Sequence, residues 1–282
     1  MALRPSISSR PDPYILGMNT RSDGWDGNNY YSNTAGKTVR TSVINTGIRN
    51  LILIAAGQSN MGSCAPTPFT PVNASVVDNF NIVDGQNYSA SDPLLGCTYA
   101  SHLGAGGVTG RLADKFITAG KFDRVITVPI SNGGTTIAMW GTGGVLNKNI
   151  GATMSRLAAR GIIPGMTGVT WAFVWGQGES DAATSQASYT TSWNQVHSTL
   201  TGTGFNGRTF ICKMTLNAGA VNANVQAAQV AVVNGSTIFS GGDADALTGA
   251  NRQADNTHLS DTGMAAFATV IYNAMVASGA PY

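Results

Sequence analysis

The sequence contains few charged residues. Asp, Glu, Lys and Arg make up 11% of its 282 residues, whereas soluble domains average about 25%. The formal net charge is only +2, and no run of basic residues occurs along the chain. Nucleic acid and acidic membrane surfaces attract proteins through clustered positive charge. We therefore expect neither nucleic acid nor a membrane among the partners of this protein.

Long apolar runs are absent as well. No stretch approaches the roughly 18 apolar residues of a membrane-spanning helix, and the first residues lack the apolar segment of a secretory signal. Ser, Thr, Asn and Gly take the place of the missing charges, with Gly contributing 35 residues. This composition favours an extracellular or virion-associated protein, although the lack of a signal leaves the localisation open.

Cysteine and histidine are scarce, with three of each. Three cysteines are too few for a disulfide scaffold, and no CxxC pair is present. Cys64 and Cys97 flank a long insertion and could form one bridge. The alternative is that all three thiols, including Cys212, are buried and reduced. Because the histidines are scattered along the chain, we expect no metal site, and no feature predicts a cofactor.

Hydrophobic residues account for 43% of the chain, which is enough for one α/β domain of this length. Strand-like runs alternate with helical ones, as in a parallel sheet with crossover helices. The expected strands cover residues 50–56, 124–130, 169–175, 208–215 and 236–239. The expected helices cover residues 107–120, 145–160, 185–201, 219–233 and 261–277. We therefore predict a doubly wound, flavodoxin-like α/β fold: a parallel five-stranded sheet with helices on both faces.

Two regions fall outside this alternation. Residues 1–48 show no helical period, and we interpret them as an N-terminal arm or small extension before the main domain, residues 49–282. Within that domain, residues 64–105 form a polar insertion. Long irregular loops are usually functional or disordered, and this one begins next to the first motif described below, so it could wall a binding cleft. No feature predicts an oligomeric state.

The most informative motif follows the first expected strand. It reads Gly57-Gln58-Ser59-Asn60-Met61 and comes directly after the apolar run LILIAA. Open α/β sheets bind ligands at the carboxyl ends of their strands. A serine there could attack an acyl carbon, with neighbouring backbone amides to stabilise the oxyanion. The simpler alternative is that Ser59 caps a following helix.

A second motif lies near the end of the chain, before the last expected helix. Asp255 and His258 are three residues apart, so one short loop would supply both side chains. A serine hydroxyl needs an adjacent base, and an imidazole held by a carboxylate suits that task. The alternative is that both residues lie on a surface loop while Ser260 or Asp261 caps the helix.

Two glycine-containing blocks follow the second and third expected strands. Gly133 and Gly134 begin the segment GGTT, and Gln177 begins the segment QGESD. Acyl transfer needs hydrogen-bond donors aimed at the developing oxyanion. A glycine N–H can approach closely, and a glutamine side chain offers a second donor. The alternatives are a turn that needs glycine and an ordinary polar loop.

Taken in their order along the chain, the four blocks resemble those of the SGNH hydrolase superfamily. The match is to its sialate O-acetylesterase-like branch, which includes the sixth family of carbohydrate esterases. In that branch GQSN carries the nucleophile, a GGT turn carries the oxyanion glycine, QGE(S/N)D replaces the usual Asn block, and D-x-x-H closes the chain. The matching segments here are residues 57–61, 133–136, 177–181 and 255–258. The resemblance covers roughly residues 50–275 and implies an SGNH-hydrolase fold.

The resemblance also implies roles for individual residues. Ser59 would be the nucleophile, His258 the general base and then acid, and Asp255 the residue that orients His258. The oxyanion would be held by the Ser59 N–H, by a glycine N–H and by the Gln177 side chain. The glycine is either Gly134, which the family pattern favours, or Gly133.

Five more residues are expected around the site, to contact substrate or to support the residues that do. They are Gln58, Asn60, Trp140, Glu179 and Asp181. We interpret Glu179 and Asp181 as braces of their loop, and a rival interpretation makes Glu179 a general base. Trp140 could either line the site or pack in the core.

The function that the resemblance implies is that of a serine esterase. It would remove short acyl groups, above all acetyl, from carbohydrate hydroxyls through an acyl-Ser59 intermediate. Two alternatives stay open. The same residues could hydrolyse acyl esters or thioesters that are not sugars, or the chain could be a carbohydrate-binding or virion structural domain that keeps the fold without turnover.

Overall fold

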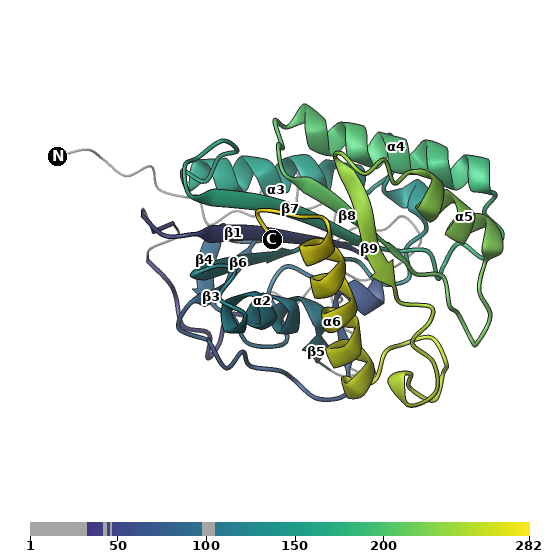
Figure 1. Ribbon diagram of the computed structural model, residues 1–282, viewed down its shortest axis with the longest axis horizontal. Coiled ribbons are helices and arrows are strands. Elements are labelled where there is room, and N and C mark those ends of the chain that lie inside the picture. Colours follow the sequence, from purple (N-terminus) through teal and green to yellow (C-terminus); the bar gives the residue numbers. More distant parts are fainter. Residues whose placement is uncertain (1–32, 42–43, 46, 98–104) are drawn as a thin grey trace.

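The computed structural model describes residues 33–41, 44–45, 47–97 and 105–282. Its centre is a seven-stranded sheet in the order β4-β3-β6-β1-β7-β8-β9 (Figure 1). The strands, in this order, are β4 (Gln86–Ser89), β3 (Val77–Asn81), β6 (Arg124–Pro129), β1 (Asn50–Gly57), β7 (Val169–Gly176), β8 (Arg208–Lys213) and β9 (Ile238–Asp243). All neighbouring strands run parallel except β4, which pairs antiparallel with β3.

The five predicted strands are present as β1, β6, β7, β8 and β9. Numbered along the chain, these five lie in the order 2-1-3-4-5 across the sheet, which is the flavodoxin-like order. The doubly wound α/β fold is therefore confirmed. Strand β1 shows why the apolar run was so clear: Leu51 and Leu53 enter one core, while Ile52 and Ile54 enter the other. A strand covered on both faces needs apolar residues at every position.

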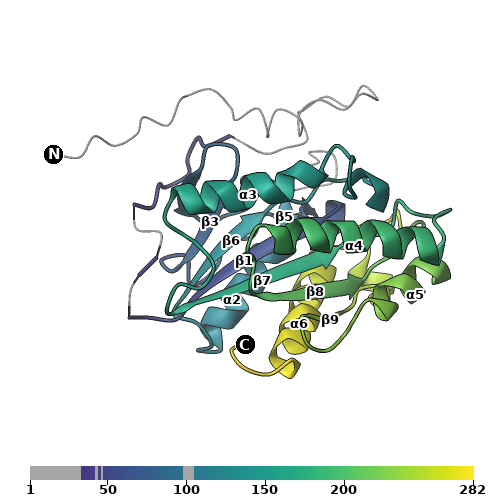
Figure 2. The ribbon, with the colours of Figure 1, turned by 90° about the horizontal axis from the view of Figure 1, so that it is seen from above.

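Helices cover both faces of the sheet, as predicted (Figures 1 and 2). Helices α2 (Val108–Thr118) and α6 (Asp261–Ala277) pack on one face. Helices α3 (Asn147–Ala159), α4 (Gln186–Gly202) and α5 (Ala223–Ala231) pack on the other. The Ser260 hydroxyl caps α6 by accepting the Gly263 N–H at 3.1 Å. This cap fixes where the chain leaves the Asp255–His258 segment.

The predicted number of strands is wrong, because the segment 64–105 contains regular structure. It supplies β3 and β4 to the large sheet, and β2 (Ser63–Ala65) pairs with β5 (Gly106–Gly107) in a second, two-stranded sheet. Strand β3 reads VDNFN, and its polar residues are buried and hydrogen-bonded: the Asp78 carboxylate accepts from Arg124, and Asn79 accepts the Leu95 N–H at 2.6 Å. A polar strand of this kind has no apolar period to reveal it.

Part of the predicted N-terminal arm lies along β4. Val39 bridges to Tyr88, the Arg40 N–H donates to the Asn87 carbonyl at 2.7 Å, and the Ser89 N–H donates to the Thr38 carbonyl at 2.8 Å. Residues 1–32 lie outside the described residues. The described part of the arm therefore continues the sheet beyond β4.

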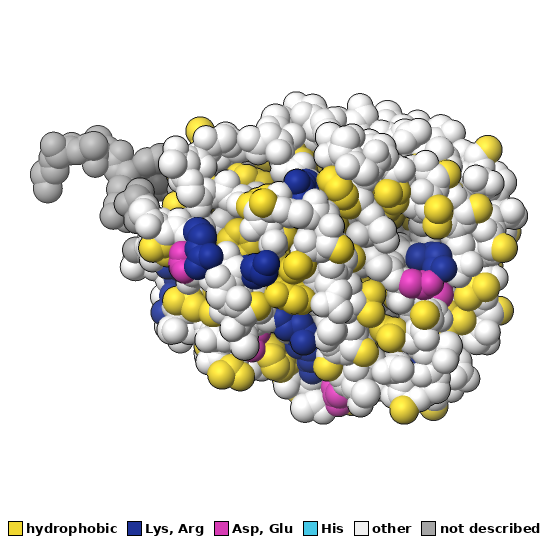
Figure 3. Space-filling view, in the orientation of Figure 1, with side chains coloured by type: hydrophobic (Ala, Val, Ile, Leu, Met, Phe, Trp, Pro, Cys, Tyr) yellow, Lys and Arg dark blue, Asp and Glu magenta, His cyan; other side chains and the backbone are white. Residues whose placement is uncertain are grey.

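The three cysteines form no disulfide, and few charged side chains lie on the face shown in Figure 3. Cys64, Cys97 and Cys212 are free and buried, which is the second of the two alternatives left open by the sequence. Figure 3 shows one face of the molecule, on which the few charged side chains stand among uncharged atoms. Among the described residues, no helix combines the length and apolar character needed to cross a membrane.

Candidate active site

Strand β1 carries Ser59 to the carboxyl edge of the sheet. The strand pairs with β7 as far as Gly57 and Gly176, and a Cβ atom on Gly57 would lie only 1.9 Å from the Gly176 carbonyl oxygen. Gly57 also has a φ of 132°, which only glycine adopts readily. The chain then makes the short 3-10 helix η2 (Ser59–Met61). Ser59 therefore does not cap an α-helix, and its side chain is buried beside the turn, with 6% of the residue exposed.

Ser59, His258 and Asp255 lie in one hydrogen-bonded series. The Ser59 Oγ is 2.9 Å from His258 Nε2, and His258 Nδ1 is 2.6 Å from Asp255 Oδ2. The structure thus brings together the three predicted residues from opposite ends of the domain. An imidazole in this position can take a proton from the hydroxyl, while the carboxylate fixes its tautomer and stabilises the imidazolium.

The Asp255 carboxylate also organises its own loop. Its Oδ1 accepts the N–H groups of Thr257 and His258, each at 2.9 Å. Partial burial favours the neutral acid, but the hydrogen bonds from the His258 ring and from these backbone groups outweigh it, so the pKa of Asp255 lies below its usual 3.8. The carboxylate is therefore ionised at neutral pH, which is the form that stabilises an imidazolium.

Arg252 and Asn217 hold this loop, and neither was predicted from the sequence. The buried Arg252 guanidinium donates to the Thr257 carbonyl at 2.6 Å and to the Leu247 carbonyl at 2.7 Å. The Thr257 hydroxyl donates to Asn217 Oδ1 at 3.0 Å. An arginine three residues before Asp255 in a charge-poor chain was the one available signal for Arg252. Nothing near Asn217 in the sequence points to the loop 40 residues away.

Asn60 joins the nucleophile segment to the same loop. Its Nδ2 donates to Glu179 Oε1 at 2.8 Å and to the Thr257 carbonyl at 3.1 Å, and its Oδ1 accepts the Leu259 N–H at 2.8 Å. Asn60 is fully buried. It therefore supports the site from behind, which is one of the two kinds of role expected for it.

Glu179, the only glutamate of the chain, is buried behind Asn60 with 2% of the residue exposed. Its second carboxyl oxygen, Oε2, has no hydrogen-bond partner. Burial raises the pKa of Glu179 to about 8, so the side chain is largely neutral at pH 7. Both ring nitrogens of His258 bond to Ser59 and Asp255, so the geometry disfavours the interpretation of Glu179 as the general base.

The Gln177 amide is enclosed within the protein. Its Nε2 donates to the Thr135 carbonyl at 2.8 Å, to Gln58 Oε1 at 3.2 Å and to the Asp181 carboxylate. A side-chain amide has two hydrogens, and Gln177 is fully buried. Both hydrogens are therefore engaged here, contrary to the expectation that Gln177 is free to bind an oxyanion.

Gln58 and Asp181 brace the Gln177 segment. Gln58 Oε1 accepts the Gly178 N–H at 3.3 Å in addition to Gln177, and Gln58 itself is buried. The Asp181 carboxylate accepts the Ile137 N–H at 3.0 Å and the Thr184 hydroxyl at 2.8 Å. This agrees with the interpretation of Asp181 as a brace and places Gln58 behind the site.

The glycine turn lies next to the nucleophile segment. The Asn132 N–H donates to the Gly57 carbonyl at 2.8 Å, so the chain after β6 runs beside the end of β1. Gly133 is buried, whereas Gly134 is exposed and has a φ of 68°. The Gly133-Gly134 pair, which holds both alternatives for the oxyanion glycine, therefore directly follows a residue that bonds to the nucleophile segment.

Trp140 belongs to the core, which is the second of its two alternatives. It is fully buried, its Nε1 donates to Thr135 Oγ1 at 3.0 Å, and its ring makes an edge contact with Trp175 at 5.3 Å. Trp140 therefore supports the glycine turn from within the core and does not line the site.

The remaining polar candidates have other partners. Asp245 accepts the Thr215 N–H at 2.7 Å, and Asp243 pairs with Lys213 at 2.5 Å, so neither competes with Asp255. His197 lies against Trp193, and His102 falls outside the described residues. Within residues 33–97 and 105–282, apart from the undescribed 42–43 and 46, no group of three His, Cys, Asp or Glu side chains is placed to hold a metal ion.

Comparisons with known proteins identify the family of this chain and agree with its fold. Residues 49–277 match the family described as "Carbohydrate esterase, sialic acid-specific acetylesterase". No curated protein matches the chain.

Among solved structures, a protein from Arabidopsis thaliana is similar with a TM-score of 0.63 and 19% identity, over 81% of this chain and 98% of that one. A novel carbohydrate acetylesterase from Xanthomonas citri is similar with a TM-score of 0.53 and 14% identity, over 79% of this chain and 55% of that one. NanS is similar with a TM-score of 0.50 and 15% identity, over 83% and 98%. At these identities, the structural likeness shows a shared fold.

Proposed function

This chain belongs to the carbohydrate esterase family of sialic acid-specific acetylesterases and is an esterase, and we propose that it removes O-acetyl groups from carbohydrate through an acyl-Ser59 intermediate. One observation carries the proposal: the hydroxyl of Ser59, the imidazole of His258 and the carboxylate of Asp255 are hydrogen-bonded in series, with 2.9 Å and 2.6 Å between the atoms.

The first half of the reaction acylates Ser59. The Ser59 Oγ attacks the acetyl carbonyl carbon while His258 Nε2 takes the hydroxyl proton. The tetrahedral intermediate collapses when its bond to the sugar oxygen breaks, and His258 returns the proton to that oxygen. The sugar leaves with a free hydroxyl, and the acetyl group remains on Ser59.

The second half releases acetate. A water molecule gives its proton to His258 and attacks the acyl carbon, and the proton then returns to Ser59 as the acyl bond breaks. The oxyanion of both intermediates would be bound by the backbone N–H of Ser59 and that of Gly134 or Gly133. We propose that Gln177 instead supports the glycine turn, because its amide hydrogens are already bonded to Thr135 and Asp181.

The test is the hydrolysis of p-nitrophenyl esters of increasing acyl length by the native chain and by Ser59→Ala. We expect acetate to be the preferred acyl group and kcat to fall by about 10⁴ or more in the variant, as for other triad serines. A Ser59→Ala protein that keeps most of its activity would overturn the assignment of the nucleophile. A native chain that binds acetylated sugar without hydrolysing any ester would instead favour the carbohydrate-binding alternative.

A further inference from the structure

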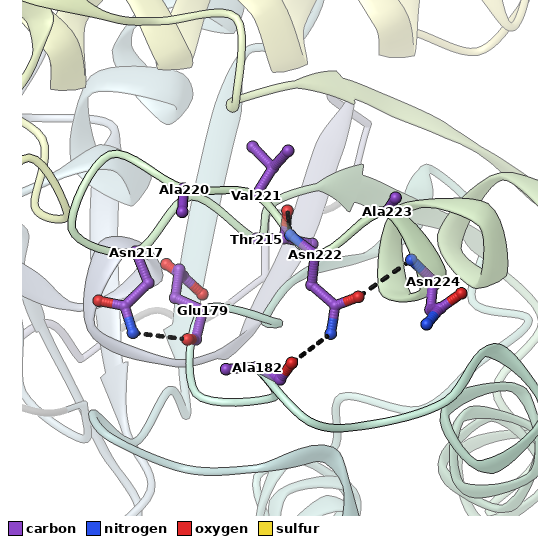
Figure 4. A pocket seen from close by; sticks show the side chains of 9 residues that line it. All are labelled: Glu179, Ala182, Thr215, Asn217, Ala220, Val221, Asn222, Ala223 and Asn224. Carbon is purple, nitrogen blue, oxygen red and sulfur yellow. Dashed lines mark hydrogen bonds between the residues drawn. The ribbon is translucent and has the colours of Figure 1, made fainter.

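A cavity whose lining does not include Ser59 opens beside the triad loop. It holds about 300 Å³, which is at the small end of the range for ligand pockets. Figure 4 shows the side chains that line it. They are Glu179, Ala182, Thr215, Asn217, Ala220, Val221, Asn222, Ala223 and Asn224. Most of them come from the segment that connects β8 to the start of α5.

The pocket is joined directly to the catalytic loop. The Thr257 hydroxyl, which donates to Asn217, also accepts the Ala218 N–H at 2.8 Å. The Gly219 N–H donates to the Asn256 carbonyl at 3.2 Å. Thr257 immediately precedes His258 in the chain. A ligand in the pocket would therefore lie next to the triad loop, as a sugar ring of a substrate must when its ester reaches Ser59.

The lining is polar but carries no positive charge. Of its nine residues, three are asparagines, one is a threonine, and the only ionisable side chain is Glu179. The nearby Arg252 is turned away, since its guanidinium donates to the carbonyls of Leu247, Thr257 and Ala244. A ligand carboxylate would therefore lose its hydration without gaining a cationic partner, which is unfavourable.

Glu179 gives the pocket a buried polar atom that has no hydrogen-bond partner. The residue is at least nine-tenths buried, and the unpartnered atom is its Oε2. Figure 4 shows the Glu179 side chain between Asn217 and Thr215. A buried oxygen without a partner is costly unless a ligand or water supplies a hydrogen bond. A sugar hydroxyl can accept from a protonated carboxyl group or from an asparagine amide and can also donate to a carboxyl oxygen. The alanine and valine methyl groups suit the apolar C–H face of a sugar ring.

We propose that this pocket binds one uncharged, hydroxyl-bearing sugar ring of the acetylated substrate and disfavours a ring that carries a carboxylate. The inference rests on the proposed esterase function and adds to it the class of sugar. The chain would then act on neutral acetylated carbohydrate in preference to acetylated sialic or uronic acids.

A matched pair of substrates tests the charge preference. One is an O-acetylated methyl glucoside, and the other is the methyl glucuronoside acetylated at the same position, so that they differ only in the carboxylate. We expect kcat/KM to be at least about tenfold higher for the neutral ester, equivalent to about 1.4 kcal/mol. Val221→Arg adds a cation at the exposed rim and should lower that ratio by about threefold or more.

A matched pair of variants tests the pocket itself. Ala182 and Ala183 are neighbouring exposed residues, but only Ala182 lines the cavity. Ala182→Trp should raise KM for the neutral sugar ester by about tenfold more than it raises KM for p-nitrophenyl acetate, whereas Ala183→Trp should change neither KM. If both tryptophan variants behave alike, or if Ala182→Trp fails to fold and Val221→Arg leaves the substrate ratio unchanged, the pocket assignment is wrong.

The two proposals fail in different ways. If the native chain hydrolyses p-nitrophenyl acetate but treats the neutral and charged sugar esters equally, the pocket proposal fails and the esterase mechanism stands. If p-nitrophenyl acetate is not hydrolysed, the mechanism fails. In that case the pocket is still tested by titrating Ser59→Ala with unacetylated methyl glucoside and methyl glucuronoside, where binding of the glucuronoside alone would overturn it.

Discussion

The two segments that meet at Ser59 are held in place by different forces. The nucleophile segment, residues 57–61, continues a central strand and is buried throughout. The triad loop, residues 252–258, lies at the surface, with 39% of the Asp255 side chain exposed. Packing between strands fixes the first segment, whereas hydrogen bonds with the side chains of Arg252, Asn60 and Asn217 fix the second. Loss of one polar group should therefore displace the loop more than the nucleophile.

The largest effect should come from breaking the contact between the two segments. Ser59→Ala and His258→Ala should each lower kcat by about 10⁴ or more, and the double variant should be no slower than either single one. The reason is that the hydroxyl and the imidazole act as one unit. Single-turnover kinetics on p-nitrophenyl acetate would measure this. Additive losses would mean that the segments contribute independently and that the series of hydrogen bonds is not the catalytic device.

The link between the segments should matter next. Asn60→Ala removes hydrogen bonds to the Thr257 carbonyl and the Leu259 N–H, so His258 should lose its alignment and kcat should fall by about 10². Asn79→Ala is a control, because Asn79 is similarly buried but bonds to Leu95 and not to the triad loop. The control should lower the melting temperature without changing kcat. Equal kcat losses in both variants would point to general destabilisation.

The brace on the nucleophile side should have a smaller effect. Gln177→Ala should lower kcat by about tenfold and also lower the melting temperature, because Thr135 and Asp181 lose a buried partner. A true oxyanion donor would cost about 10²–10³ in kcat. A loss of that size with unchanged stability would restore Gln177 to the oxyanion site and show that its amide is released when substrate binds.

The smallest effect should be on pH-dependent stability. Burial raises the pKa of Glu179 from 4.5 to about 8, so the folded protein keeps a proton that the unfolded chain releases. The stability linked to this proton is complete below the unfolded pKa and is lost as the pH rises towards 8. Glu179→Gln cannot ionise, so its melting temperature relative to the native chain should rise by roughly 10 °C between acidic and mildly alkaline pH, since each pKa unit corresponds to about 1.4 kcal/mol. A constant difference across that range would show that Glu179 is already ionised when folded.

The same contrast explains what the sequence could predict. Ser59, Asp255 and His258 were found because each lies in a compact motif beside a recognisable strand or helix, and the apolar runs of β1, β6 and β7 gave the order of the fold. The roles of the residues that support the site could not be predicted, because their partners are far away in the sequence. The Asn60 contact with Leu259, for example, spans 199 positions. No local pattern records such a pairing.

Strand β3 and Gln177 show two further limits. The residues of β3 are polar and pair with Arg124 and Leu95 elsewhere in the chain, so an apolar period could not reveal the strand. Gln177 follows β7, as predicted, but the direction of its amide depends on Thr135 and Asp181. Residue type thus predicted which segments meet at the carboxyl edge of the sheet, and the packed structure showed which of their polar groups already have partners.

The short pairing of residues 38–40 with β4 has a consequence for solubility. It covers the outer backbone groups of a strand that would otherwise end the sheet, and exposed strand edges are templates for pairing with other molecules. A chain shortened to begin at β1 would lose this cover. It should retain the triad but self-associate edge to edge, so any trimmed version made for crystallisation or for screening should keep these few residues.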